Sequence, residues 1–366
     1  MKYSFLLFGL FFCCSSFGQR REKLQKNKFN SEKFKPYEVE LKKKWFDSTR
    51  LQFCDDAEFI DIRADKSKLG FIRTGDANEF FNLKFGEETG SYINSRLVNM
   101  IRPKLKTGNT IKIVIKHFWL SQLIVRGALV KKIFLGDSKG FLSYCFFSCD
   151  YYLRRGDELQ YVGKLDTVFY FRKWMGHSTA DLAKNAVETA IEVGDSLAAK
   201  PQAGSLSFND KQFTDTINAM YNFPILATNA PKPGIYVRYT DFLNNTPLEG
   251  IFELVSKKGE ENIMAQGIDT SITNNAWGYC SDEGIFKHIN DEYYRMTRVQ
   301  NTFEMSGPRE IKKTYTTGEN FFIIGLNTFL GGMLGGAGSI FQMLSDKSIM
   351  NELVPYQLNI RTGTYY

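Results

Sequence analysis

The sequence predicts an α+β fold in two domains, each a largely antiparallel sheet with a few helices. Three observations support this prediction. The chain has 366 residues, more than a single hydrophobic core usually organises. Apolar and polar residues alternate at period two through both halves, with helical periodicity in only a few stretches. Residues 200–207 (KPQAGSLS) have the proline, glycine and serine content of a linker between the halves.

Residues 1–18 have the organisation of a secretory signal peptide. Lys2 precedes an apolar run from Phe5 to Phe12, and small residues follow up to Gly18. We expect cleavage near Gly18 and a mature chain that begins at Gln19. A lipid anchor is disfavoured, because Phe12 rather than a small residue precedes Cys13. The sequence therefore predicts export, with the mature protein periplasmic or associated with the outer membrane.

Residues 19–50 are predicted to form a basic leader or tether. The segment from Gln19 to Lys44 carries ten Lys and Arg residues against four Glu, whereas the rest of the mature chain is electrically neutral. A nucleic-acid-binding protein normally shows a basic face on its folded part, so this function class is excluded. The leader is predicted to be a solvated segment, with contact to an anionic membrane surface as the alternative.

Residues 51–199 are predicted to form the N-terminal α+β domain. Two alternating runs separated by a short polar turn predict a strand pair at its start, and consecutive strands later in the domain predict an antiparallel sheet with helices on one face. Its predicted strands are Glu58–Ala64, Lys68–Thr74, Thr110–Leu120, Ala128–Leu135, Phe141–Leu153 and Glu158–Arg172, and its predicted helices are Ser91–Ile101 and Thr179–Ala199.

Residues 208–366 are predicted to form the C-terminal, β-rich domain. Short strands separated by turn residues predict a meander between Ala276 and Met305. A final hairpin is predicted over Tyr356–Ile360 and Thr364–Tyr366. The remaining predicted elements are helices at Asp210–Tyr221 and Asp241–Thr246 and strands at Ile235–Tyr239, Ile251–Ser256 and Ile311–Tyr315.

An uncharged, glycine-rich stretch, residues 321–344, interrupts the C-terminal domain. As one helix it would span roughly 36 Å, enough to cross a bilayer core of about 30 Å. Its glycines would weaken a helix in water, and the strand and turn residues of Tyr356–Tyr366 would complete the sheet that precedes it. An apolar hairpin buried against the C-terminal sheet is therefore favoured, with membrane insertion as the alternative. We expect it to contact a partner or a membrane. The contact residues would be Phe321, Phe322, Gly331, Gly332, Gly335, Gly336 and Phe341.

The cysteines Cys54, Cys145, Cys149 and Cys280 remain in the mature chain. Cys145 and Cys149 lie four positions apart in a predicted strand, about 13 Å in length, which is too far for a mutual disulfide. Their spacing is also a poor match to a metal site. Buried free thiols and other pairings both remain open, and no metal site or cofactor is predicted.

Catalytic residues are scarce, since the chain has only three histidines, His117, His177 and His288. No familiar hydrolase or nucleotide-binding motif occurs in the sequence. Cys280 and His288 could meet on neighbouring strands, but their spacing does not require it. His177 and Ser178 begin the strongest predicted helix, where free backbone N–H groups could bind an anion. No residue is predicted to be catalytic, and an enzyme is the less favoured alternative.

Three segments resemble the second half of uncharacterised secreted proteins of the Bacteroidota: GIYVRYTDFLNNTPL (234–248), NAWGYCSDEGIF (275–286) and YQLNIRTGTYY (356–366). The resemblance implies an envelope location and no particular activity. Together with the signal peptide, it favours a non-catalytic binding or structural module that contacts an envelope partner or a membrane surface. A periplasmic hydrolase and a membrane-inserted component of an envelope complex are the alternatives.

Overall fold

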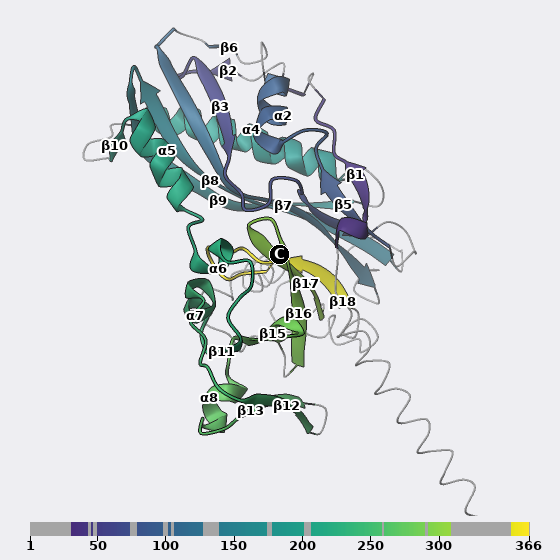
Figure 1. Ribbon diagram of the computed structural model, residues 1–366. Coiled ribbons are helices and arrows are strands. Elements are labelled where there is room, and N and C mark those ends of the chain that lie inside the picture. Colours follow the sequence, from purple (N-terminus) through teal and green to yellow (C-terminus); the bar gives the residue numbers. More distant parts are fainter. Residues whose placement is uncertain are drawn as a thin grey trace, which may run out of the picture. The chain divides into compact units, whose positions relative to one another are not determined.

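The computed structural model describes residues 31–42, 45–46, 50–73, 79–97, 102–103, 106–126, 139–173, 178–200, 206–257, 260–289, 292–308 and 353–365. These residues form two compact units (Figure 1). The first unit contains the described residues from 31 to 221, and the second contains those from 222 to 308 and from 353 to 365. Both combine helices with largely antiparallel sheets, which confirms the predicted α+β class.

The first unit is built on an eight-stranded sheet in the order β1-β5-β4-β7-β8-β9-β10, with β3 also paired to β7. Its three long strands run antiparallel to one another, as predicted. A two-residue pairing of β2 with β6 lies outside this sheet. The strands are β1 Lys35–Glu38, β2 Arg50–Leu51, β3 Asp56–Asp61, β4 Gly70–Arg73, β5 Phe80–Lys84, β6 Arg102–Pro103, β7 Asn109–Arg126, β8 Lys139–Arg155, β9 Glu158–Lys173 and β10 Ser207–Phe208.

The predicted strand pair at the start of this domain is wrong in its pairing. β3 and β4 do not bond to each other; each runs parallel to β7, β3 beside Thr110–Ile115 and β4 beside Leu120 and Ser121. The two strands thus lie end to end along one edge of β7. Sequence alternation identified both strands but carries no information about which strand each one joins.

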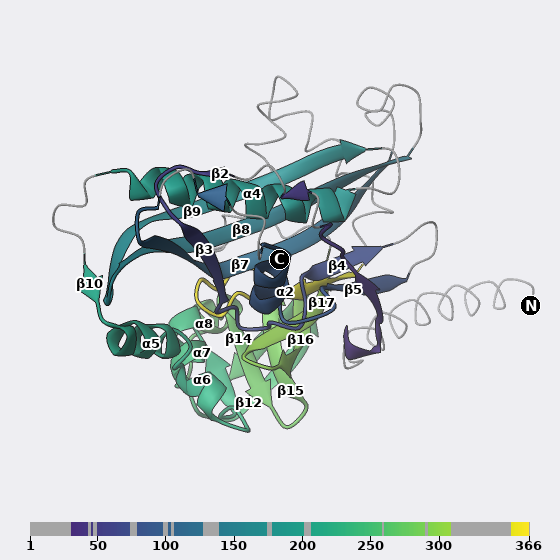
Figure 2. The same ribbon diagram turned by 90° about the horizontal axis from the view of Figure 1, so that it is seen from above.

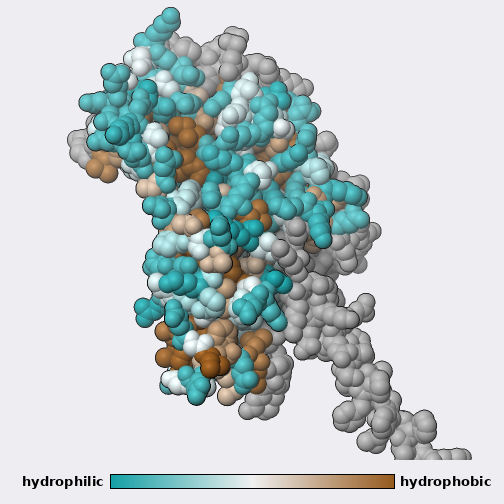
Figure 3. All heavy atoms as spheres, viewed as in Figure 1, coloured by the Kyte–Doolittle hydropathy of each residue, from teal (hydrophilic) through white to brown (hydrophobic). Residues whose placement is uncertain are grey.

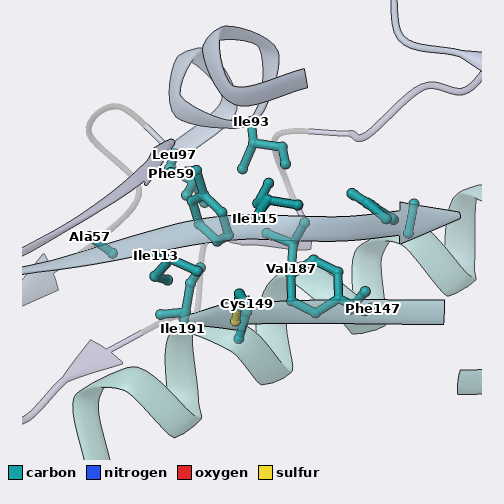
Figure 4. Packing of buried hydrophobic residues seen from close by; sticks show 14 of the residues in the cluster. Ala57, Phe59, Ile93, Leu97, Ile113, Ile115, Phe147, Cys149, Val187 and Ile191 are labelled. Carbon is teal, nitrogen blue, oxygen red and sulfur yellow. The ribbon is translucent and has the colours of Figure 1, made fainter. Parts of the chain in front are cut away.

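The main core of the first unit lies between the sheet and helices α2, Thr89–Leu97, and α4, Ser178–Ala198. Figure 2 shows α4 lying across the long strands, and Figure 4 shows Val187 and Ile191 of α4 beside Cys149 and Phe147. The carboxylate of Asp195 also anchors this helix, because it accepts hydrogen bonds from three successive backbone N–H groups, those of Gln52, Phe53 and Cys54.

Helices α2 and α4 share one face of the sheet, and helix α5, Asp210–Ala219, covers one end of the opposite face. Phe213 of α5 packs against Tyr152 with ring centroids 4.9 Å apart, and Phe208 of β10 lies 5.9 Å from the same ring. These contacts keep residues 207–219 in the first unit. The division between the units therefore falls at 221, later than the predicted linker at 200–207.

The second unit is a six-stranded sheet in the order β11-β14-β15-β16-β17-β18 with a separate two-stranded hairpin, β12-β13. The predicted meander is confirmed, and the final strand pairs with β17 although residues 309–352 separate them in sequence. The strands are β11 Gly234–Tyr236, β12 Phe252–Lys257, β13 Glu260–Ala265, β14 Gly278–Ser281, β15 Gly284–Ile289, β16 Glu292–Val299, β17 Thr302–Pro308 and β18 Leu353–Gln357. The helices are α6 Pro224–Ala227, α7 Tyr239–Asn244 and α8 Thr270–Asn274.

One face of this sheet packs against α7 through aromatic rings. Phe242 of α7 lies 4.4 Å from Trp277 and 5.2 Å from Phe303, measured between ring centroids. The buried ammonium group of Lys287 lies 4.7 Å from the centre of the Trp277 ring. The other face carries Tyr279, Phe286 and Tyr293, which pack against the β12-β13 hairpin.

A buried arginine fills the junction between β3 and β4. Nη1 of Arg63 donates to the carbonyl oxygens of Lys68 and Phe118, at 2.6 and 3.1 Å. Its Nε and Nη2 atoms donate to the buried carboxylate of Asp61, and Nη2 also donates to Thr89 at the start of α2. The guanidinium group therefore satisfies carbonyl groups at the point where β7 changes its partner strand.

We expect Arg63→Met to lower the free energy of unfolding by about 3–5 kcal/mol, because it leaves the buried Asp61 carboxylate and two carbonyl groups without their donor. Urea unfolding of the full chain, followed by circular dichroism, measures the change. The matched control is Lys66→Met, which removes an exposed ion pair with Glu88 and should cost about 1 kcal/mol or less. Equal effects of the two substitutions would contradict this role for Arg63.

Candidate functional site

Most of the predicted site residues lie outside the described part of the chain. These are His177 and all seven contact residues of the glycine-rich stretch: Phe321, Phe322, Gly331, Gly332, Gly335, Gly336 and Phe341. Ser178 is the first residue of α4, so the helix begins at the predicted place. The predicted anion site and the predicted membrane or partner contact at 321–344 therefore stay predictions.

The two described histidines lie in different units, and His288 does not meet Cys280. His117 belongs to the first unit and His288 to the second. Cys280 lies opposite Ile285 in the β14-β15 register, whereas His288 lies three positions further along β15. Side chains alternate between the faces of a strand, so Cys280 and His288 point to opposite faces of the sheet. The Cys280–His288 pair considered from sequence does not form.

The four described cysteines are free and buried. Burial raises the pKa of the Cys54 and Cys149 thiols to about 12 and that of Cys280 to about 11. Burial likewise raises the pKa of Cys145 well above its ordinary value. Nucleophilic cysteines need the opposite shift, because the thiolate is the reactive form. The described cysteines are core residues.

His117, Ser148 and Asp166 form a row across β7, β8 and β9 on the sheet face opposite α4. In a catalytic triad the histidine stands between the serine and the carboxylate. Here the serine is in the middle, and its hydroxyl donates to Asp166. Burial alone would raise the pKa of Asp166, but hydrogen bonds from Ser148 and Lys164 outweigh this effect and lower it. The row is an arrangement that holds Asp166 ionised and does not activate Ser148.

The described residues contain no group of three or more His, Cys, Asp or Glu side chains that could hold a metal ion. No described helix is both long enough and apolar enough to cross a membrane.

The candidate site is an exposed apolar surface around the β12-β13 hairpin. Eight large hydrophobic residues of the described chain are exposed, and five of them fall between 248 and 272. We call these five residues the hairpin surface: Leu248, Ile251, Leu254, Met264 and Ile272. Ile251 is 78% exposed and Met264 49%. Figure 3 shows hydrophobic side chains gathered over β12, β13 and α8.

Both faces of the hairpin carry apolar residues. Phe252, Ile263 and Ala265 lie on the inner face and pack against the six-stranded sheet. On the outer face, Ile251 and Met264 are diagonal neighbours, since Ile251 accepts a hydrogen bond from Gln266 and Met264 lies two residues before it. These two residues share the outer face with the polar residues Glu253 and Gln266. A solvated strand face normally carries polar residues, so exposed apolar side chains at 251 and 264 are unusual there.

Sequence reasoning found β12 but missed β13, α8 and the hairpin surface. Glu260–Ala265 (EENIMA) does not alternate regularly between apolar and polar residues. A short strand without such alternation cannot be recognised from periodicity. The available indication was the run Ile251–Val255 (IFELV), whose apolar residues fall at both odd and even positions. Such a run predicts a strand with two covered faces.

No family model matches the sequence, and no curated protein matches it. Among solved structures, a protein of Xanthomonas campestris with the family model DUF330 is similar at 10% identity and a TM-score of 0.23, over 51% of this chain and 97% of that chain. A second structure, described as an uncharacterized protein, gives 11% identity and a TM-score of 0.22, over 45% and 96%. Likenesses this distant carry no argument about function.

The histidine of the polar row should make stability depend on pH. Burial, with a smaller effect of the Arg63 charge, lowers the pKa of His117 to about 3. Its folded-state pKa lies below its unfolded value of about 6.5, so its contribution to stability is complete above about pH 6.5 and is lost as the pH falls toward 3.

We therefore expect unfolding free energies of wild type to fall more steeply than those of His117→Gln between about pH 6.5 and 4. The difference in slope should approach, at most, about 1.4 kcal/mol per pH unit, the value for one proton. Urea unfolding at a series of pH values measures both curves. Parallel curves would show that His117 is not held neutral by the fold.

Proposed function

We propose that this protein is exported to the cell envelope and acts there as a binding module, through the hairpin surface of its second unit, rather than as an enzyme. The observation that carries the proposal is the concentration of exposed large hydrophobic side chains within residues 248–272. Contiguous exposed apolar patches are unusual on monomeric proteins and mark sites of interaction.

Covering the exposed side chains of the hairpin surface would contribute free energy of binding. Fully burying a Leu, Ile or Met side chain is worth about 1.5–3 kcal/mol, so covering even part of Leu248, Ile251, Leu254, Met264 and Ile272 gives a partner a substantial driving force. Phe252, Ile263 and Ala265 of the inner face are already packed, whereas Leu254 on the same face is 41% exposed. A partner would therefore gain most of its binding energy at the outer-face residues Ile251 and Met264.

The residues available for chemistry support binding over catalysis. His288 and Cys280 occupy opposite faces of their sheet, and the described thiols are held protonated by burial. The serine of the His117, Ser148 and Asp166 row donates to a carboxylate instead of to a general base. Export is supported by the signal-peptide pattern of residues 1–18.

Site-specific photocrosslinking tests this function. The full chain would be expressed in a Bacteroidota host with a photoreactive amino acid at position 251, and at the exposed position 211 of α5 as a matched control. We expect a discrete crosslinked species from position 251 in the envelope fraction and none from position 211. Equal yields at the two positions, or a protein confined to the cytoplasm, would contradict the proposal.

A substitution supplies the complementary test. Ile251→Asp should leave the unfolding free energy within about 0.5 kcal/mol of wild type, because this side chain is largely solvated. It should nevertheless reduce crosslinking from a photoreactive residue placed at the neighbouring position 264, since a charge in the contact opposes association. Unchanged crosslinking at 264 would show that the hairpin surface is not the contact.

A further inference from the structure

Several edge strands of the described sheets are protected against pairing with other chains. An open strand edge exposes unpaired N–H and C=O groups, which proteins block with proline, charge, short length or a covering element. β1 carries Pro36 between charged residues, and β18 carries Pro355. The edge strands β10 and β11 have only two and three residues.

The edge of β3 is blocked by a side chain that imitates a strand. The Asn94 amide of α2 accepts from the Phe59 N–H at 2.8 Å and donates to the Phe59 carbonyl at 2.9 Å. This arrangement occupies both backbone groups of that residue.

β12 is longer than the short edge strands β10 and β11 and contains no proline, although Glu253 and Lys257 are charged. It has six residues, FELVSK, with no proline, glycine or register shift in its pairing with β13. The bond from Gln266 N–H to Ile251 C=O fixes the pattern of the hairpin. Hydrogen bonds alternate along an antiparallel pair, so Glu253, Val255 and Lys257 bond to β13 while the backbone groups of Phe252, Leu254 and Ser256 face outward. In the described chain, no backbone group outside β12 bonds to Phe252 or Leu254.

We propose that the β12 edge pairs with the β12 edge of a second copy of this chain, antiparallel and with Val255 on the two-fold axis. The inference rests on the proposed binding function and names its partner. Pairing would join two hairpins into a four-stranded sheet in the order β13-β12-β12-β13. Leu254 of each copy would exchange backbone hydrogen bonds with Ser256 of the other.

Charge complementarity favours a second copy and sets this register. The segment Glu253–Lys257 (ELVSK) begins with an acid and ends with a base. With Val255 on the axis, Glu253 of each copy lies opposite Lys257 of the other, twice in a symmetric pair. Centring on Leu254 would place Glu253 opposite Val255 and remove both charge pairs. Isologous pairing therefore matches the sequence of this edge in one register.

Disulfide trapping in the full chain tests both the partner and the register. Val255 on the axis would occupy a position without mutual hydrogen bonds, where Cα atoms lie about 4.5 Å apart, within disulfide range. Val255→Cys should give a covalent dimer on mild oxidation. Leu254→Cys is the matched control, because its two copies would lie about 8 Å apart, beyond that range. The four described cysteines are buried, so background crosslinking through them should be low.

Charge reversal provides a second, non-covalent test by sedimentation equilibrium. Glu253→Lys converts two opposite-charge pairs into like-charge pairs and should raise the dimer dissociation constant about tenfold. The double variant Glu253→Lys with Lys257→Glu should recover part of this loss. Glu249→Lys makes the same change in charge at an exposed residue outside the strand and should have little effect.

The outcomes separate this inference from the function on which it rests. A Val255→Cys dimer with no Leu254→Cys dimer supports the pairing. Covalent dimer from both variants, or from neither, overturns it. A wild-type chain that stays monomeric at about 100 µM also overturns it, because dimers bound by more than about 5 kcal/mol would be detected at that concentration. If the chain is monomeric while position 251 still crosslinks to a different protein in the envelope, the binding function stands and the partner is heterologous.

Discussion

The buried ion pair between Arg63 and Asp61 is the constraint on which the first unit depends. A long strand, β7, has to pair with β3 along one part of its edge and with β4 along another, and the break between them would leave carbonyl groups buried without donors. Arg63 supplies those donors, and Asp61 neutralises its charge. Gly70 completes the junction, because a Cβ atom there would lie 1.7 Å from the Leu120 carbonyl oxygen.

The second unit differs from the first in how its strand edges are protected. Its sheet ends in short or proline-containing strands, whereas the hairpin beside it keeps a long open edge and apolar residues on both faces. Exposed Ile251 and Met264 would be costly in a protein with no partner, since apolar area left in water forgoes about 25 cal/mol per Å². In the proposed pairing, the edge would supply direction through backbone hydrogen bonds, and the hairpin surface would supply affinity.

Elements with strong periodicity could be predicted from the sequence, and their partners could not. The spacing of Leu182, Ala186 and Ile191 predicts α4, and the turns after Cys280 and Ile289 predict the meander. Nothing local shows that β3 and β4 share an edge of β7, because that pairing depends on contacts distant in sequence. The candidate site was missed for a related reason: Ile251 and Met264 form a surface only once β12 and β13 pair.

Amide hydrogen exchange of the full chain at low and high protein concentration gives the most direct test of the exposed β12 edge as the contact. Exchange at Leu254 and Ser256, whose N–H groups face outward, should slow as concentration rises, while exchange at Glu253 and Val255, already bonded to β13, should not change. Exchange at Leu254 and Ser256 that is independent of concentration would contradict pairing of two copies through this edge.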